Sequence, residues 1–186
     1  MGKSAVSAMF RRAGVPVFDA DAAVHELQGP GGRLVPAIEA HFPGTTGPGG
    51  VDRQRLGAAV LGHPERLRTL ERLIHPAVAH MRVRWLIRNR ARRLVVLDIP
   101  LLFEKRGWRS VDVIVVVSAP AWVQRKRVLA RPCMTAAKLR HILALQTPDH
   151  EKRRRAHHVI ATGRLHHQTE RQVRRLVACL GRKSGR

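Results

Sequence analysis

The sequence predicts an α/β fold in three layers, with a parallel sheet flanked by helices. Two continuous apolar runs carry this prediction, residues 94–100 and residues 111–118, because a strand buried on both faces has this composition. Segments of helical periodicity surround both runs, and this alternation favours parallel strands joined by right-handed crossovers. With 186 residues, 44% of them hydrophobic, the chain is expected to form one domain.

The remaining elements follow from periodicity and from turn residues. Residues 15–19 and 159–161 are predicted to be short strands, and the glycine-rich stretch 43–50 is predicted to be a loop. The helical region from about residue 34 to residue 93 interrupts the alternation, so it reads as an insertion that caps the ligand-binding end of the sheet. Helices are expected at residues 2–12, 20–27, 34–42, 52–61, 64–74, 76–93, 120–131, 135–146 and 167–180.

The chain is strongly basic, with 35 Lys and Arg against 13 Asp and Glu and a net charge of +22. Such a charge attracts polyanions through counterion release, so nucleic acid is one candidate partner. Proteins that bind single strands interleave aromatic and basic residues, whereas aromatic residues make up only 4% of this chain and Tyr is absent. The composition therefore favours an enzyme of small phosphorylated substrates, and no specific nucleic acid is expected.

Membrane and secretion signals are not found in the sequence. The longest apolar-rich stretch, residues 113–123, is too short and too interrupted to span a bilayer. The N-terminus lacks the regions of a signal peptide, so we predict a cytoplasmic protein without a membrane partner. Cys133 and Cys179 lack metal-type spacing and are expected to be free thiols.

Gly2, Lys3 and Ser4 match the closing half of the phosphate-binding motif G-x-x-x-x-G-K-[ST], at the start of a predicted helix. In such a loop, backbone N–H groups hold phosphates, the lysine reaches the β- and γ-phosphates, and the hydroxyl binds Mg²⁺. The tripeptide is common by itself, so a solvated N-terminus is the alternative.

Three aspartates follow predicted strands, where parallel strand ends meet at one ligand-binding edge. Asp98 ends residues 94–98 as a Walker B acid would, to hold the metal; the alternative is an acid that caps the turn before Pro100. Asp19 and Asp21 flank Ala20 at the end of the strand predicted at residues 15–19. We expect Asp21 to be the base that accepts the proton of an attacking hydroxyl, and the other acid to be structural, for example as a helix N-cap.

Together these motifs closely resemble those of the dephospho-coenzyme A kinase family, along nearly the whole chain. The resemblance implies a P-loop NTPase-like fold and transfer of the ATP γ-phosphoryl group to the ribose 3′-hydroxyl of dephospho-coenzyme A, with Mg²⁺. The string from Asp98 to Glu104 is the most specific part. The other matching segments are Gly2-Lys3-Ser4, Val17-Phe18-Asp19-Ala20-Asp21, His75-Pro76, and Gln146 with Glu151-Lys152.

The resemblance assigns roles by position. Lys3 and Asp21 are implied to be catalytic, and Ser4 and Asp98 to hold the metal. The nucleotide is implied to bind Gly2, Lys3 and Ser4 and two arginines, Arg127 and Arg131, of a mobile lid. The residues implied to bind the acceptor are Asp19, His75, Pro100, Leu101 and Glu104.

For single residues, structural alternatives remain open. Each lid arginine could instead lie on a solvated helix face, and His75 could simply end one helix before Pro76 starts the next. The resemblance also implies the organisation of the expected monomer: a core of residues 1–28, 94–120 and 155–180, a helical acceptor-binding insertion of residues 29–93, and a lid of residues 121–154.

The sequence departs from the family pattern at its start, where the family has a central strand and a glycine-rich half-loop before Gly2. We expect the 186-residue form to bind ATP weakly and to fold marginally, because the missing strand would expose its neighbours. A methionine inside the loop taken as the start codon would explain the departure. His157 and His158 stand where the family has an acid, and altered local contacts are expected there.

Two other classes of function remain as alternatives: a basic nucleic-acid-binding module, and a P-loop kinase of nucleosides or shikimate-like acceptors. Aspartates at strand ends favour a kinase over the binding module. The string from Asp98 to Glu104 favours dephospho-coenzyme A over other acceptors.

Overall fold

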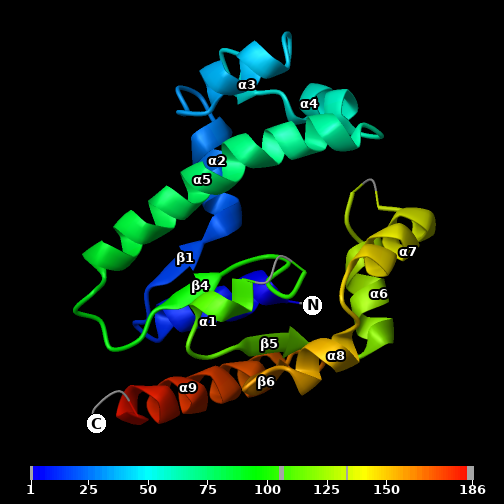
Figure 1. The fold of residues 1–186 in the computed structure, drawn as a ribbon. Coiled ribbons are helices and arrows are strands. Elements are labelled where there is room, and N and C mark those ends of the chain that lie inside the picture. Colours follow the sequence, from blue (N-terminus) through cyan, green and yellow to red (C-terminus); the bar gives the residue numbers. More distant parts are fainter. Residues whose placement is uncertain (1, 105–106, 133, 184–186) are drawn as a thin grey trace. The chain divides into compact units, whose positions relative to one another are not determined.

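A computed structural model describes residues 2–104, 107–132 and 134–183 of the chain (Figure 1). Cys133 lies outside these residues, and Cys179 is a free, exposed thiol. The chain divides into two compact units, which are described separately. Unit 1 comprises Met1–Val17 and Arg93–Arg186, and unit 2 comprises Phe18–Arg92. The domain limits expected from the sequence stay a prediction.

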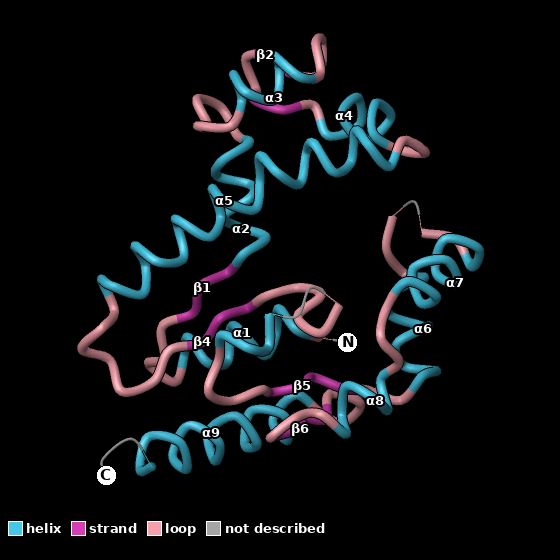
Figure 2. The backbone as a smooth tube through the Cα atoms, viewed as in Figure 1, coloured by secondary structure: helices cyan, strands magenta, loops and turns pink. Residues whose placement is uncertain are grey.

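Unit 1 alternates helices with short strands, as expected for an α/β fold (Figure 2). Strands β5 and β6 pair in parallel, from Val115 opposite His158 to Ser118 opposite Ala161. In chain order its elements after residue 93 are β4 (Val96–Asp98), a 3₁₀ turn (Gly107–Ser110), β5 (Val115–Ser118), α6 (Ala121–Leu129), α7 (Ala136–Leu145), α8 (Asp149–Arg154), β6 (His158–Ala161) and α9 (His166–Lys183).

The core of unit 1 lies between the first and last helices and the strands. Helix α1 (Lys3–Arg12) contributes Val6, Met9 and Phe10 to this core. The opposing side chains, which come from the segment after α1, from β6 and from α9, are Val15, Ile160, Val173 and Leu176. Burial of these apolar side chains stabilises unit 1, at roughly 25 cal/mol per Å² of apolar surface removed from water.

The strands of unit 1 are shorter than the apolar runs that predicted them. Beside β4, the Val96 N–H donates to the Pro16 carbonyl at 2.9 Å. The predicted strand 94–100 stops at Asp98, because Pro100 has no N–H to donate and Leu101 adopts a positive φ of 54°. The predicted strand 111–118 begins only at Val115, since the Ile114 N–H donates instead to His157 Nδ1 at 2.9 Å.

A side chain occupies the outer margin of β6. The Gln172 amide of α9 accepts from the Ala161 N–H at 3.0 Å and donates to the Ala161 carbonyl at 3.1 Å. Both backbone groups of Ala161 are therefore satisfied without another strand.

Unit 2 is mainly helical, as the predicted insertion required. Its buried core is formed by Leu27, Leu34, Ile38, Phe42, Leu56, Leu70 and Ala77. The elements are α2 (Ala20–Gln28), α3 (Val35–His41), β2 (Thr46–Gly47), β3 (Gly50–Val51), α4 (Arg53–Val60) and α5 (Pro64–Arg88), while β1 (Val17–Asp19) leads into the unit.

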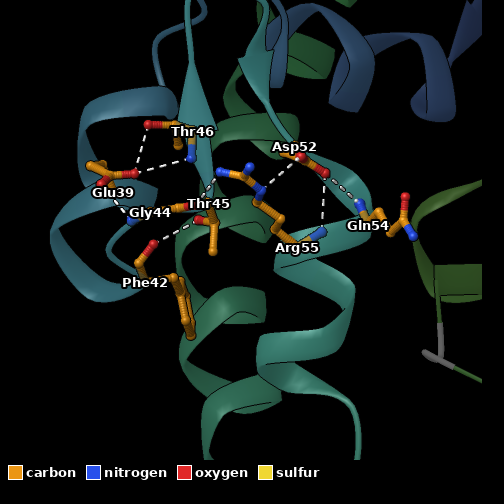
Figure 3. Close-up of polar contacts among 8 residues, drawn as sticks. All are labelled: Glu39, Phe42, Gly44, Thr45, Thr46, Asp52, Gln54 and Arg55. Carbon is orange, nitrogen blue, oxygen red and sulfur yellow. Dashed lines mark hydrogen bonds and ion pairs between the residues drawn. The ribbon is translucent and has the colours of Figure 1, made fainter.

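The expected loop at residues 43–50 is wrong in part, because it contains a small antiparallel hairpin of β2 and β3. Glu39 organises the hairpin's entry by accepting hydrogen bonds from the Gly44 N–H at 2.7 Å and the Thr46 hydroxyl at 2.7 Å (Figure 3). These bonds, that of the Gly44 N–H first, lower the pKa of Glu39 despite some desolvation. Asp52 then caps α4 by accepting from the Gln54 and Arg55 N–H groups.

The prediction of two helices at residues 64–74 and 76–93 is wrong, because α5 continues through Pro76 and ends at Arg88. The proline removes only one helical N–H, and its φ suits a helix. Leu70 and Ala77 are buried on either side of it, so packing holds the helix across the break in its hydrogen bonds. Within the described parts of the chain, no helix is both long enough and apolar enough to cross a bilayer.

Candidate active site

The N-terminus of α1 has the geometry of an anion site. Gly2 caps the helix with φ of 88°, a conformation that glycine adopts without strain, and as a glycine it has no side chain to cap the first turn. Lys3 and Ser4 open the helix directly after it. The positive end of the helix dipole and the N–H groups of the first turn favour a bound anion such as a phosphate.

Lys3 and Asp98 meet although they are far apart in sequence. The Lys3 ammonium lies 2.8 Å from Asp98 Oδ1, and the Ser7 hydroxyl donates to Asp98 Oδ2 at 2.7 Å. The carboxylate is buried, with its side chain only 5% exposed, whereas the lysine side chain is 39% exposed. The Asp98 carboxylate, at the end of β4, thus holds the Lys3 ammonium beside the N-terminus of α1.

Ser7 was not identified from the sequence as part of this site. It lies one helical turn after Lys3 and is buried, so its spacing on the inner face of the predicted helix is the one available signal. Lys3 pairs with Asp98 Oδ1, and the Ser7 hydroxyl donates to the other oxygen, Oδ2. Buried carboxylate oxygens require such donors.

Arg127 also lies beside the N-terminus of α1. Its Nη2 donates to the Thr162 carbonyl at 2.8 Å and its Nη1 to the Thr162 hydroxyl at 3.4 Å. A Cβ atom placed on Gly2 would be 3.5 Å from Thr162 and 3.6 Å from Arg127 Nη1. Arg131 is exposed just after α6, where its backbone N–H donates to the Val128 carbonyl.

The residues predicted after β4 form a tight turn. Leu101 has a positive φ and is 41% exposed, and the Gly107 N–H closes the turn by donating to the Leu102 carbonyl at 2.9 Å. Glu104 does not face open solvent: its Oε1 accepts from the Thr147 N–H at 2.8 Å and lies 3.0 Å from Lys152 Nζ.

The electrostatics of Glu104 follow from these contacts. Burial acts to raise the pKa of its carboxyl, but hydrogen bonds from Lys152 and from the backbone, together with the Lys152 charge, outweigh burial and lower the pKa. The group is therefore a carboxylate near neutral pH. The sequence places Lys152 in a motif with Glu151, and its partner Glu104 comes from a separate segment of the chain.

The other predicted residues belong to unit 2. Asp19 caps α2, with its Oδ1 accepting from the Ala22 N–H at 3.0 Å, while Asp21 lies exposed in the first turn of that helix. His75 lies inside α5, so the alternative that it ends one helix before Pro76 starts another is wrong. His75 and Pro76 line an open hollow on α5, together with Glu65, Arg68, Glu71 and Arg72.

The donor set suits a metal held mostly by its substrate. Within residues 2–104, 107–132 and 134–183, no three His, Cys, Asp or Glu side chains gather to hold an ion. Mg²⁺ in nucleotide sites is typically bound by one or two protein oxygens together with phosphates and waters. The exposed Ser4 hydroxyl and the Asp98 carboxylate fit that requirement, whereas a site built only from protein ligands does not.

Comparison with known proteins relates the whole chain to one family. The family model described as dephospho-CoA kinase matches residues 1–167. The dephospho-CoA kinase of Novosphingobium aromaticivorans is 61% identical over all of this chain and 92% of its own length. That of Zymomonas mobilis is 50% identical over 97% of this chain and 91% of its own.

Solved structures agree with the α/β fold. The structure of TT1252 from Thermus thermophilus has a TM-score of 0.82 at 34% identity and covers 96% of this chain and 92% of its own. A dephospho-CoA kinase from Campylobacter jejuni has a TM-score of 0.67 at 18% identity, with 96% and 91% coverage, and shows the fold alone. The predicted P-loop NTPase-like fold is thereby confirmed, and the chain belongs to the dephospho-CoA kinase family.

Proposed function

We propose that this chain transfers the γ-phosphoryl group of ATP to the 3′-hydroxyl of the ribose of dephospho-CoA, which yields CoA. One observation carries the proposal: the Lys3 ammonium is held 2.8 Å from the Asp98 carboxylate at the open N-terminus of α1. The identity of the acceptor comes from the relatives, which are named dephospho-CoA kinases and which this chain matches over nearly their full length.

The phosphate groups are bound by positive groups of unit 1. The N–H groups after Gly2 and the ammonium of Lys3 bind the transferred end of the triphosphate, where charge develops as the phosphoryl group moves. Arg127, whose guanidinium lies beside Gly2, stabilises the same charge. Arg131 is the second lid arginine of the proposal, and its exposed side chain is free to turn toward a bound nucleotide.

Ser4 and Asp98 are the residues that would hold Mg²⁺. Both Asp98 oxygens already accept a protein donor, so the carboxylate is suited to bind the hydrated ion through water. A Mg²⁺ ion held there would supply positive charge that offsets the negative charge of the phosphates. Ser7 keeps the carboxylate in place by its hydrogen bond to Oδ2.

Asp21 is the proposed base. It is the exposed acid of the pair that starts α2, and Asp19 is already engaged as the helix N-cap. Asp21 accepts the proton of the attacking 3′-hydroxyl as the oxygen bonds to phosphorus and ADP leaves. The proposed acceptor-binding residues are Asp19, His75, Pro100, Leu101 and Glu104, with Asp19 and Glu104 acting through the turns that they stabilise.

The test is a coupled assay of ADP release with ATP, Mg²⁺ and dephospho-CoA. We expect activity with this acceptor and none with nucleosides or shikimate. Asp21→Asn should lower kcat by about 10²-fold or more, as expected for loss of a general base, whereas Asp52→Asn, which alters another exposed helix cap, should not. Phosphorylation of a nucleoside in place of dephospho-CoA would contradict the proposal.

A further inference from the structure

The turn after β4 contains a backbone conformation that needs support. Leu101 has φ of 54°, in the left-handed region that a branched, bulky residue rarely adopts, and its side chain is 41% exposed. Such strain persists only where the surrounding structure holds the chain in place, and it is common at functional sites. The residues that hold this turn are therefore of interest for the reaction.

One set of contacts reaches the turn from the segment that starts α8. Glu104 Oε1 accepts from the Thr147 N–H at 2.8 Å and pairs with Lys152 Nζ at 3.0 Å. The ion pair is largely shielded from solvent, with the lysine side chain 12% exposed and the glutamate side chain 15% exposed. Shielding strengthens the attraction and reduces screening by salt.

A second contact comes from the C-terminal end of α8. The Arg155 guanidinium lies 4.9 Å from the centroid of the Phe103 ring and 5.5 Å from that of Trp108. Phe103 is buried next to Glu104 in the chain. Helix α8 therefore holds the turn at two adjacent residues, by an ion pair and by a cation–π contact.

The same helix is fixed to the neighbouring strand. The Ser118 hydroxyl, at the end of β5, donates to Asp149 Oδ2 at 2.6 Å in the first turn of α8. Helix α8 thus contacts both the turn after β4 and the end of β5.

We propose that Lys152 is a positioning residue for the acceptor: through its ion pair with Glu104 it holds residues 100–104 in the strained conformation that presents Leu101. This inference rests on the proposed kinase function and adds to it a residue that acts through Glu104. It also reassigns Glu104, which the sequence placed among the acceptor-binding residues, to the support of the turn.

Kinetics of matched variants test the pairing. Lys152→Met and Glu104→Gln should each lower kcat/KM for dephospho-CoA by about tenfold or more, because misplaced substrate groups cost rate, while the KM for ATP changes by less than about twofold. The double variant should be no worse than Lys152→Met, since both changes break one interaction. Arg153→Met is the control, because it removes an exposed cation from the same helix.

Two kinetic outcomes would overturn the proposal. If the effects of Lys152→Met and Glu104→Gln multiply in the double variant, Glu104 acts on the substrate independently of Lys152. If Lys152→Met is as active as Arg153→Met, the ion pair does not position anything that the reaction needs. Assays are run well below the unfolding temperature of each variant, so a loss of folded protein does not enter the rates.

Amide hydrogen exchange separates this proposal from the kinase function. In the native chain the Thr147 N–H donates to Glu104, and the Gly107 N–H donates to the Leu102 carbonyl. We expect both amides to exchange faster in Lys152→Met but not in Arg153→Met. If the chain phosphorylates nothing and this change is still seen, only the kinase function fails. If Lys152→Met does not fold, Glu104→Gln is measured in its place. Unchanged exchange at both amides overturns the positioning role.

Discussion

Two lysine–carboxylate pairs lie on either side of the turn after β4, and they differ in how open they are. Lys3 reaches Asp98 at 2.8 Å with 39% of its side chain exposed. Lys152 reaches Glu104 at 3.0 Å with only 12% exposed. The two distances are nearly equal and both carboxylates are shielded, with 5% and 15% of the side chain exposed, so the exposure of the lysine and not the contact distance separates the pairs.

The difference teaches how one kind of interaction can serve two purposes. An exposed ammonium exchanges its carboxylate for a phosphate at little desolvation cost, so the pair of Lys3 and Asp98 suits a group that must rebind during turnover. A shielded pair loses much when either partner is removed, because the remaining charge is left in a poor solvent. The pair of Lys152 and Glu104 therefore suits a fixed support.

The largest expected effect comes from breaking the open pair of Lys3 and Asp98. Lys3→Met should lower kcat by about 10²–10³-fold, the cost of removing one charged donor from a developing negative charge. Arg12→Met is the control on the same helix, because its ion pair with Glu170, at 3.9 Å, is exposed and contributes less than about 1 kcal/mol. Steady-state rates with saturating ATP give the comparison. Equal rates for the two variants would remove Lys3 from the chemistry.

A smaller effect concerns the carboxylate of the open pair. Ser7→Ala should lower the free energy of unfolding by about 1–3 kcal/mol, because the buried Asp98 Oδ2 loses its donor. Ser4→Ala, an exposed change three residues earlier, should alter it by less than about 0.5 kcal/mol, yet raise the Mg²⁺ concentration needed for activity. Urea unfolding and a Mg²⁺ titration measure the two quantities. Equal stability losses would place both hydroxyls in the same environment.

The smallest expected effect is a pH dependence of the free energy of unfolding that comes from the shielded pair. Because the pKa of Glu104 lies below its ordinary value of 4.5 in the folded chain, the unfolded state binds more protons just below that pH. The stabilisation is complete above pH 4.5 and is lost as pH falls through the folded-state pKa. The free energy of unfolding of the wild type should exceed that of Glu104→Gln by about 1–2 kcal/mol at neutral pH. In urea unfolding, this difference should shrink below pH 4.5. A difference independent of pH would contradict the ion pair.

The sequence predicted the open pair better than the shielded one. Lys3 and Asp98 each belong to a motif whose place in an α/β sheet is known from parallel topology, so their meeting could be expected before the structure. Lys152 and Glu104 are joined by packing between α8 and a turn, and neither periodicity nor a motif predicts such a long-range pair. Ser7 was missed because, unlike Lys3, it belongs to no recognised motif, and its partner Asp98 lies 91 residues away.

Local structure was predictable where one physical signal dominated. The N-cap role expected of one acid at residues 19–21 falls to Asp19, and its carboxylate spacing from the Ala22 N–H follows from ordinary cap geometry. The break expected at Pro76 did not occur, because burial of Leu70 and Ala77 outweighs one lost hydrogen bond. Tertiary packing thus decided the case in which local propensity and burial disagreed.

The amide of Gln172 has a consequence for association with other polypeptides. Extended peptides commonly attach to a protein by adding to an unpaired strand margin through main-chain hydrogen bonds. At Ala161 those bonds are already taken by the side chains of Gln172 and Thr169, so an incoming segment would first have to displace them. Side chains of α9 therefore occupy, at Ala161, the backbone groups that an added strand would need.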